Sequence, residues 1–118
     1  MRVEAESHAR SAAVLGAASL FRSLSDSTRL EILDLLSEHV ELRVVDLVGR
    51  LGLAQSTVST HLACLRGCGL IEVRPEGRQS FYRIAIDELS CLLRDAQTVL
   101  VATGHAPATC PTYGLDPR

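Results

Sequence analysis

The stretch Ala54–Gly69, AQSTVSTHLACLRGCG, decides how the chain is organised, and its spacing predicts a single helix. At about 100° per residue, Val58, Leu62 and Leu65 fall on one apolar stripe that faces a core. The opposite side carries short uncharged side chains that fit a narrow groove, namely Ser56, Ser59, Thr60 and Ala63. Cys64 and Cys68 lie one turn apart on the flank between these sides. One helix therefore combines a packing face, a reading face and a pair of thiols.

Three further helices are predicted upstream of this one. They cover Glu4–Leu24, which is rich in alanine, Thr28–Ser37 and Val44–Leu51. Ser25-Asp26-Ser27 ends the first and caps the second, and Gly52 stops the third. Two short helices joined by a tight glycine turn, of which the second has a polar face, form a helix-turn-helix.

After Gly69 the pattern changes to that of a β-hairpin. We expect a strand from Leu70 to Val73, a turn at Pro75-Glu76-Gly77 and a returning strand over Ser80–Ile84. A last helix is expected from Ile86 to about Thr103, followed by a proline-rich tail that is irregular and, alone, mobile. The order of these elements predicts a mainly α fold with a β-hairpin, a winged helix-turn-helix over residues 1–104 and a flexible tail over 105–118.

The composition bounds the class of protein. A chain of 118 residues forms one domain with a modest core, and 3% aromatic residues imply a core of Leu, Val, Ile and Ala. Such a core borrows surface from a partner, so we expect a homodimer with a helical interface built from the terminal helices. The sequence offers neither a membrane-spanning run nor a signal peptide, so a cytoplasmic location without membrane partner is expected. Four cysteines in such a chain favour thiol or metal chemistry over disulfides.

The charge is unevenly distributed along the chain. The net charge is −2, yet residues 42–85 carry six Arg against three acidic residues. A basic segment inside an acidic scaffold fits a localised DNA-binding surface, although a chance fluctuation of Arg along a short chain is the alternative. Major-groove or phosphate contacts are expected from the start of the polar-faced helix and from the hairpin, through Gln55, Ser56, Ser59, Thr60, Arg74 and Arg78.

The residues resemble the ArsR/SmtB family of metal-sensing repressors. The matching stretches are LSDSTRLEIL, VVDLVGRLGLAQSTVSTHLACLRGCGLIEVRPEGRQSFYRI and the final helix. The resemblance implies a winged helix that binds operator double-stranded DNA as an apo dimer and leaves it on binding metal. Two ligand arrangements of the family are absent here, because Glu41–Leu47 contains no cysteine and Leu89 replaces the partner of Asp87.

The remaining thiols resemble those of the cadmium- and lead-sensing CmtR-type repressors. That resemblance implies Cys64, Cys68 and Cys110 as metal ligands and Cd²⁺ or Pb²⁺ as the inducer. The chemistry agrees, because side chains at i and i+4 converge on one ion and thiolates select soft metals. Arg66 is expected to favour the thiolate form. Alternatives left open are Hg²⁺ or As(III) as the inducer, a thiol-based redox sensor, and cysteines that merely pack as small hydrophobic residues.

Cys91, His61 and the spacing of Cys68 and Arg74 give weaker indications of function. Cys91 is expected to pack against a neighbouring helix, and His61 to have a structural or phosphate-contacting role. Cys68 and Arg74 have the Cys-x5-Arg spacing of phosphatases and some arsenate reductases, but that chemistry needs an anion-binding loop at a helix N-terminus. Here the cysteine ends a helix and strand residues follow it. An enzyme is therefore not expected.

Overall fold

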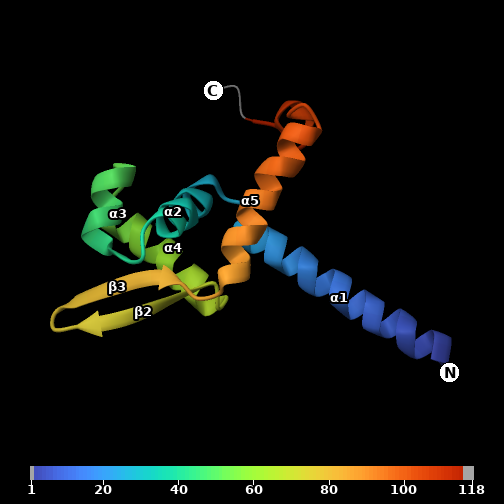
Figure 1. Ribbon diagram of the computed structural model, residues 1–118, viewed down its shortest axis with the longest axis horizontal. Coiled ribbons are helices and arrows are strands. Elements are labelled where there is room, and N and C mark those ends of the chain that lie inside the picture. The colour runs from blue at the N-terminus through green and yellow to red at the C-terminus, as the bar shows by residue number, and fades with distance from the viewer. Residues whose placement is uncertain (1, 116–118) are drawn as a thin grey trace. The chain divides into compact units, whose positions relative to one another are not determined.

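The computed structural model describes residues 2–115, which form five α-helices, three strands and one 3₁₀ helix (Figure 1). Their bounds are α1 Arg2–Leu24, α2 Ser27–Glu38, β1 Leu42–Arg43, α3 Val44–Leu51, α4 Gln55–Gly67, β2 Ile71–Glu76, β3 Gln79–Ile84, α5 Asp87–Ala102 and η1 Ala106–Thr109. The chain forms two compact units, which divide between Ala85 and Ile86. The predicted mainly α fold with a hairpin is confirmed.

The core of the first unit lies between α2, α3, α4 and the sheet. Its buried side chains are Leu24, Ile32, Leu33, Leu36, Leu42, Leu47, Val58, Leu62, Leu65, Leu70 and Ile71. All are aliphatic, as the low aromatic content predicts. Leu47 of α3 and Val58 of α4 are completely buried, so the helix-turn-helix is fixed to this core. Burial of each such side chain contributes about 1.5–3 kcal/mol.

The ends of α2 and α3 follow from local capping. Asp26 caps α2, with its Oδ1 accepting a hydrogen bond from the backbone N–H of Arg29 at 3.0 Å. This bond holds the pKa of Asp26 below its ordinary value. At the other end of the motif, Gly52 ends α3 at φ 67°, a left-handed conformation that favours glycine. The predicted stop at Gly52 is confirmed, and the predicted break is confirmed at Ser25 and Asp26, whereas Ser27 already belongs to α2.

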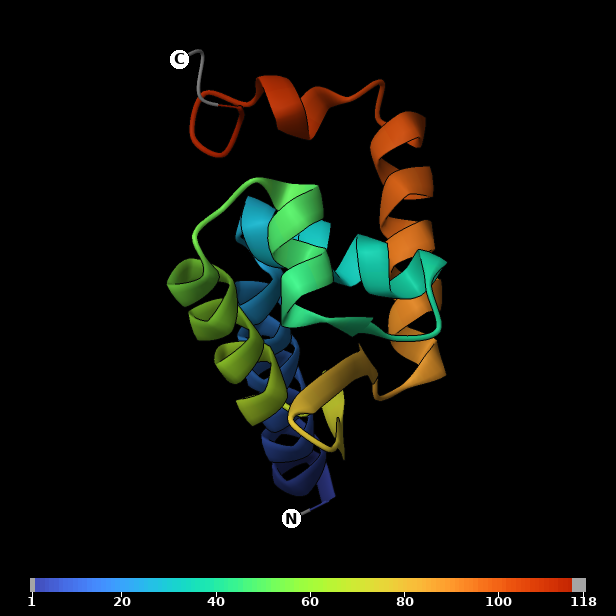
Figure 2. The same cartoon turned by 90° about the vertical axis from the view of Figure 1, so that its left-hand side faces the viewer.

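Figure 2 shows α3 and α4 joined by a short turn, as a helix-turn-helix requires. The bounds of α3 match the prediction. The predicted helix over Ala54–Gly69 is shorter in the structure, because Ala54 is the N-cap and Cys68 the C-cap. Gly69 has a φ of 75° and therefore lies outside the helix.

The sheet differs from the predicted hairpin in two ways. A third strand, β1, pairs with β3, so the strand order is β1-β3-β2. The hairpin turn is Gly77-Arg78, because Pro75 and Glu76 still pair with Ser80 and Gln79. Proline is tolerated there because β2 is an edge strand, and Gly77 supplies the positive φ, 60°, that a two-residue turn needs.

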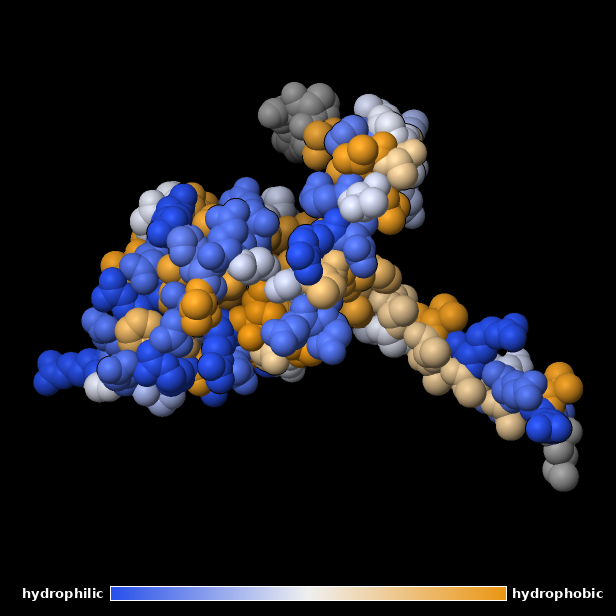
Figure 3. Space-filling view, in the orientation of Figure 1, coloured by the Kyte–Doolittle hydropathy of each residue, from blue (hydrophilic) through white to orange (hydrophobic). Residues whose placement is uncertain are grey.

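Helix α1 exposes most of its apolar side chains. Val3 is 77% exposed, and Val14, Leu15 and Phe21 are also exposed. Figure 3 shows apolar residues running along the surface of α1. Only Leu24, at its end, is buried. Such a helix lacks a packing partner within the described chain.

The second unit consists of α5 and a folded tail. Val99 and Val101 of α5 are exposed. The tail, predicted to be irregular, instead forms η1 and a closed turn, in which Gly114 N–H donates to the carbonyl of Cys110 at 2.8 Å. The last residues of the predicted tail, 116–118, lie outside the described residues. None of the described helices combines the length and apolarity needed to cross a membrane.

Candidate DNA interface and thiol site

The predicted reading face lies exposed on α4. Gln55, Ser56, Ser59 and Thr60 are all exposed, whereas Val58, Leu62 and Leu65 on the other side are buried. The core therefore fixes which side of α4 faces outward. The hydroxyl of Thr60 donates to the carbonyl of Ser56 at 2.9 Å, so its oxygen remains chiefly as an acceptor.

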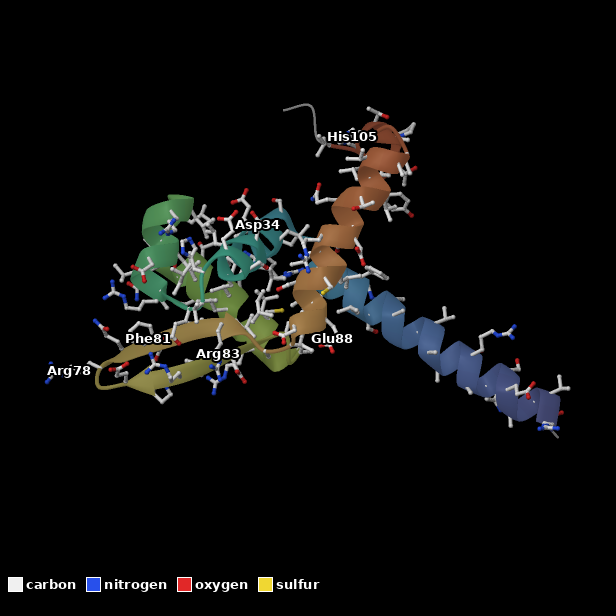
Figure 4. The ribbon with its side chains drawn as sticks, viewed as in Figure 1. Asp34, Arg78, Phe81, Arg83, Glu88 and His105 are labelled. Atoms are coloured by element: carbon white, nitrogen blue, oxygen red, sulfur yellow. The ribbon has the colours of Figure 1, made fainter. Side chains whose placement is uncertain are left out.

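The start of α4 lies beside the wing. Ala54 provides no side-chain cap, so the first N–H groups of the helix lack the usual side-chain acceptor. A shallow hollow of about 260 Å³ lies between the starts of α3 and α4 and the hairpin, and is lined by Arg43, Val44, Val45, Gln55, Arg78, Gln79, Ser80 and Tyr82. Arg78 projects from the tip of the hairpin (Figure 4). The wing tip and the start of the reading face thus border one surface.

Three of the arginines in the basic segment are held by carboxylates. Arg43 pairs with Asp46 at 3.0 Å and Arg83 with Glu72 at 2.6 Å. Arg74 pairs with both Glu41 and Glu76, with 2.6 Å between its Nη1 and Glu76 Oε2. Its guanidinium also lies over the ring of Phe81, 4.7 Å from the centroid.

These contacts bear on the predicted DNA role of Arg74. The hydrogen bond from Arg74 holds the pKa of Glu41 below its ordinary value, and Glu41 and then Glu76 raise the pKa of Arg74. Glu41 and Glu76 engage three of the five N–H donors of Arg74 and offset its charge, which weakens its attraction for a phosphate. Arg74 thus stabilises the wing sheet, and the structure gives no support to its prediction as a DNA contact. Arg83 lies beside Phe81 on the same strand (Figure 4).

Cys64 and Cys68 form an exposed pair at the end of α4. The N–H of Cys68 donates to the carbonyl of Cys64 at 3.0 Å, and Cys68 keeps a helical backbone although it is the C-cap. The predicted one-turn spacing is therefore confirmed. Arg66 lies two residues from each cysteine, so it projects about 160° away from both around the helix, and the prediction that it favours their thiolate form gains no support from this geometry.

Cys110 lies in the second unit, within the turn of the tail. Hydrogen bonds from the backbone N–H groups of Tyr113 and Thr112 lower the pKa of its thiol. Gly114 is required to close this turn, since an added Cβ would lie 2.4 Å from the carbonyl oxygen of Cys110. Sequence reasoning missed the lowered pKa of this thiol, for which the only signal was Gly114 itself.

No group of three His, Cys, Asp or Glu able to hold a metal is gathered within the described residues. Cys91 is exposed, and Arg94 Nη2 donates to its sulfur at 3.4 Å. The predicted packing of Cys91 against a neighbouring helix is therefore not found in the described chain. His61 is half-buried on α4, and its charge contributes to lowering the pKa of Asp26, which places it beside the cap of α2. This position agrees with a structural role.

Comparison with known proteins identifies the family. Residues 26–73 match the model of bacterial regulatory proteins of the arsR family. The transcriptional regulator CmtR of Mycobacterium tuberculosis H37Rv is 44% identical over 85 residues, which cover 72% of this chain and 71% of the relative. The arsenical resistance operon repressor of Escherichia coli K12 is 47% identical over 66 residues, or 56% of either chain.

A solved structure supports the same assignment. It is the homodimeric winged helix-turn-helix domain of a possible ArsR-family regulator from Mycobacterium bovis, with 36% identity and a TM-score of 0.68. It covers 76% of this chain and 83% of the solved chain. These relatives are transcriptional regulators rather than enzymes, so the Cys-x5-Arg spacing does not mark a catalytic site. The chain belongs to the ArsR family of bacterial regulatory proteins and is a DNA-binding transcriptional regulator with a winged helix.

Proposed function

We propose that this protein is a homodimeric repressor that holds operator DNA in its apo form and releases it on binding a soft metal ion, Cd²⁺ or Pb²⁺. The observation that carries the proposal is the pair of exposed thiols, Cys64 and Cys68, one turn apart at the end of the recognition helix α4. Metal bound there acts on the same helix that reads DNA. In the cytoplasm, where we place the protein, such thiols remain reduced.

The DNA contacts come from α4 and the wing. Gln55, Ser56 and Ser59 are exposed, uncharged and able to hydrogen-bond to base edges or phosphates. Arg78 at the tip of the hairpin provides a cation for the backbone. Thr60 contributes as an acceptor, because its hydroxyl proton is donated within the helix.

The donor set fits a soft metal. Side chains at i and i+4 have Cβ atoms about 5–6 Å apart, so two thiolates can share one ion. All-thiolate coordination favours soft metals over Mg²⁺ or Ca²⁺. Cys110 is the third ligand that we propose. Because the pKa of its thiol is lowered, removing the thiol proton on metal binding costs less free energy. Cys64, Cys68 and Cys110 would hold the metal, which would then link α4 to the tail within one protomer or across the dimer.

Dimerisation follows from the exposed apolar side chains of the terminal helices. Phe21 and Leu15 of α1 and Val99 of α5 are exposed in a single chain. A second copy is the partner that buries them, as the homodimeric relative from Mycobacterium bovis suggests. Each protomer then presents one α4 to one half-site of the operator.

The test begins with an operator selected by the apo protein from a pool of random-sequence duplexes. That duplex is then titrated with Cd²⁺, Pb²⁺, Hg²⁺, As(III) and Zn²⁺, and separately with hydrogen peroxide. Release by Cd²⁺ or Pb²⁺, together with thiolate-to-metal charge-transfer absorbance in the near ultraviolet, is the expected result. Release by Hg²⁺ or As(III) alone would assign a different inducer. Release by peroxide alone would replace the metal mechanism with thiol oxidation, and failure to select any duplex would contradict DNA binding.

A further inference from the structure

The positive charge of the basic segment is concentrated on a few of its arginines. Carboxylates neutralise Arg43, Arg74 and Arg83. Among the described residues, the other arginines of 42–85, namely Arg50, Arg66 and Arg78, form no ion pair. These three guanidinium groups can bind phosphate without competition from a paired carboxylate.

Arg66 lies on the reading face of α4. It follows Ser59 by seven residues, or two turns, so the two side chains project within about 20° of each other. Arg66 is exposed. It also projects from the side of the helix opposite Cys64, so a role in DNA contact does not compete with the thiol pair. The reading face of short uncharged residues therefore ends in a cation.

Arg78 marks the other end of the same face. It borders the hollow that Gln55, the first residue of α4, also lines. Arg66 lies eleven residues further along the helix, a rise of about 16 Å. The major groove is about 12 Å wide, so a helix of this length seated in it brings its two ends close to the two phosphate backbones that border the groove.

We propose that Arg66 is a phosphate contact, and that Arg66 and Arg78 bind the backbone on the two sides of the major groove while the short side chains between them read bases. Arg83 and Arg74 make no such contact. This inference rests on the proposed DNA-binding function, and assigns the charged groups that supply its salt-dependent part.

The experiment compares Arg66→Gln with Arg83→Gln, a matched variant that removes the same charge from an arginine already paired with Glu72. Arg78→Gln and Arg66→Lys complete the set. Binding of the full-length protein to a fluorescein-labelled random-sequence duplex, long enough for two half-sites, is measured by anisotropy over a series of salt concentrations. Circular dichroism verifies that each variant is folded.

The slope of log K against log salt changes by about 0.9 for each phosphate that the protein no longer neutralises. Arg66→Gln and Arg78→Gln are therefore each expected to flatten the slope by about two for a dimer, while Arg83→Gln leaves it unchanged and Arg66→Lys restores it. An unchanged slope in Arg66→Gln, or an equal flattening in Arg83→Gln, would overturn the inference and leave DNA binding intact. A wild-type protein that does not bind the duplex would overturn both.

Discussion

The reading face and the thiol flank of α4 differ in what they need in order to work. The reading face is complete within the first unit, because Val58 and Leu65 are buried and hold Ser59 outward. The thiol flank supplies only Cys64 and Cys68, and the third proposed ligand, Cys110, belongs to the second unit. In the proposed mechanism, DNA binding thus rests on local packing, whereas the metal response depends on a site assembled from both units. Substitutions on the reading face and on the thiol flank should therefore have separate effects on DNA binding and on metal binding.

The largest expected effect follows from Ser59→Glu. A carboxylate on the reading face repels the phosphates that border the groove, so operator binding is expected to fall below detection in an anisotropy titration. Ser59→Ala is the matched variant, which removes the hydroxyl without adding charge and is expected to cost about 1 kcal/mol of binding. The Ser59→Glu protein should still bind Cd²⁺, since the thiol flank is unchanged. Retained operator affinity in Ser59→Glu would show that this face does not read DNA.

The opposite result, loss of metal binding with DNA binding retained, is expected from Cys64→Ser and Cys68→Ser. Each removes one thiolate of the pair and should abolish tight Cd²⁺ binding and its charge-transfer absorbance. Because the hydroxyl is similar in size and exposed at both positions, the apo protein should bind the operator as the wild type does. Cys91→Ser is the control, and should leave both properties unchanged. Tight Cd²⁺ binding by either Cys64→Ser or Cys68→Ser would exclude that residue as a ligand.

A smaller effect is expected from Gly114→Ala. The added Cβ clashes with the carbonyl of Cys110 and opens the tail turn, so Tyr113 and Thr112 no longer donate to the thiol. The pKa of Cys110 should rise toward its ordinary value, and Cd²⁺ affinity should weaken at neutral pH more than at alkaline pH. The thiolate absorbance in the far ultraviolet, followed against pH, measures this directly. Thr112→Ala keeps the backbone N–H and should have no effect; equal shifts in the two variants would contradict this explanation.

The smallest effect concerns the wing. The pKa of Glu41 is lowered by Arg74, so the ion pair stabilises the folded state above the unfolded pKa and is lost as pH falls through the folded pKa. Glu41→Gln removes it at all pH values, so it should lower Tm slightly at neutral pH and flatten the fall of Tm below pH 4.5 by the same small amount, because the guanidinium is largely exposed. Glu38→Gln, which changes an exposed residue at the end of α2, is the control. The same acid dependence in wild type and Glu41→Gln would exclude this pair as its source.

The same contrast explains what the sequence could predict. The bounds of α3 and the buried stripe of α4 follow from local periodicity and from Gly52, so they could be read directly from the residues. Strand β1 is only two residues long and is defined by its pairing with Tyr82 and Phe81, which no local pattern reveals. The turn was misplaced because Pro75 is a common turn residue, yet on an edge strand it is tolerated.

The candidate site divides in the same way. The spacing of Cys64 and Cys68 is a property of one helix and was predictable. The ion pair between Arg74 and Glu41 was not predictable, because the two residues lie 33 positions apart in sequence. The stabilised thiol of Cys110 depends on backbone N–H groups, which side-chain identities do not show. Arg66 was assigned to the thiols by proximity in sequence, although the helix turns it to the other side.

The most direct test of the proposed switch uses Cys110→Ser beside the wild type, with Cys91→Ser as control. Cd²⁺ is titrated into the protein–operator complex while charge-transfer absorbance and operator affinity are followed in the same sample. Cys110→Ser is expected to bind Cd²⁺ more weakly through the remaining thiol pair and to stay on the operator at concentrations that release the wild type. If Cys110→Ser binds Cd²⁺ and leaves the operator as the wild type does, the tail plays no part in the switch and the proposed mechanism is wrong.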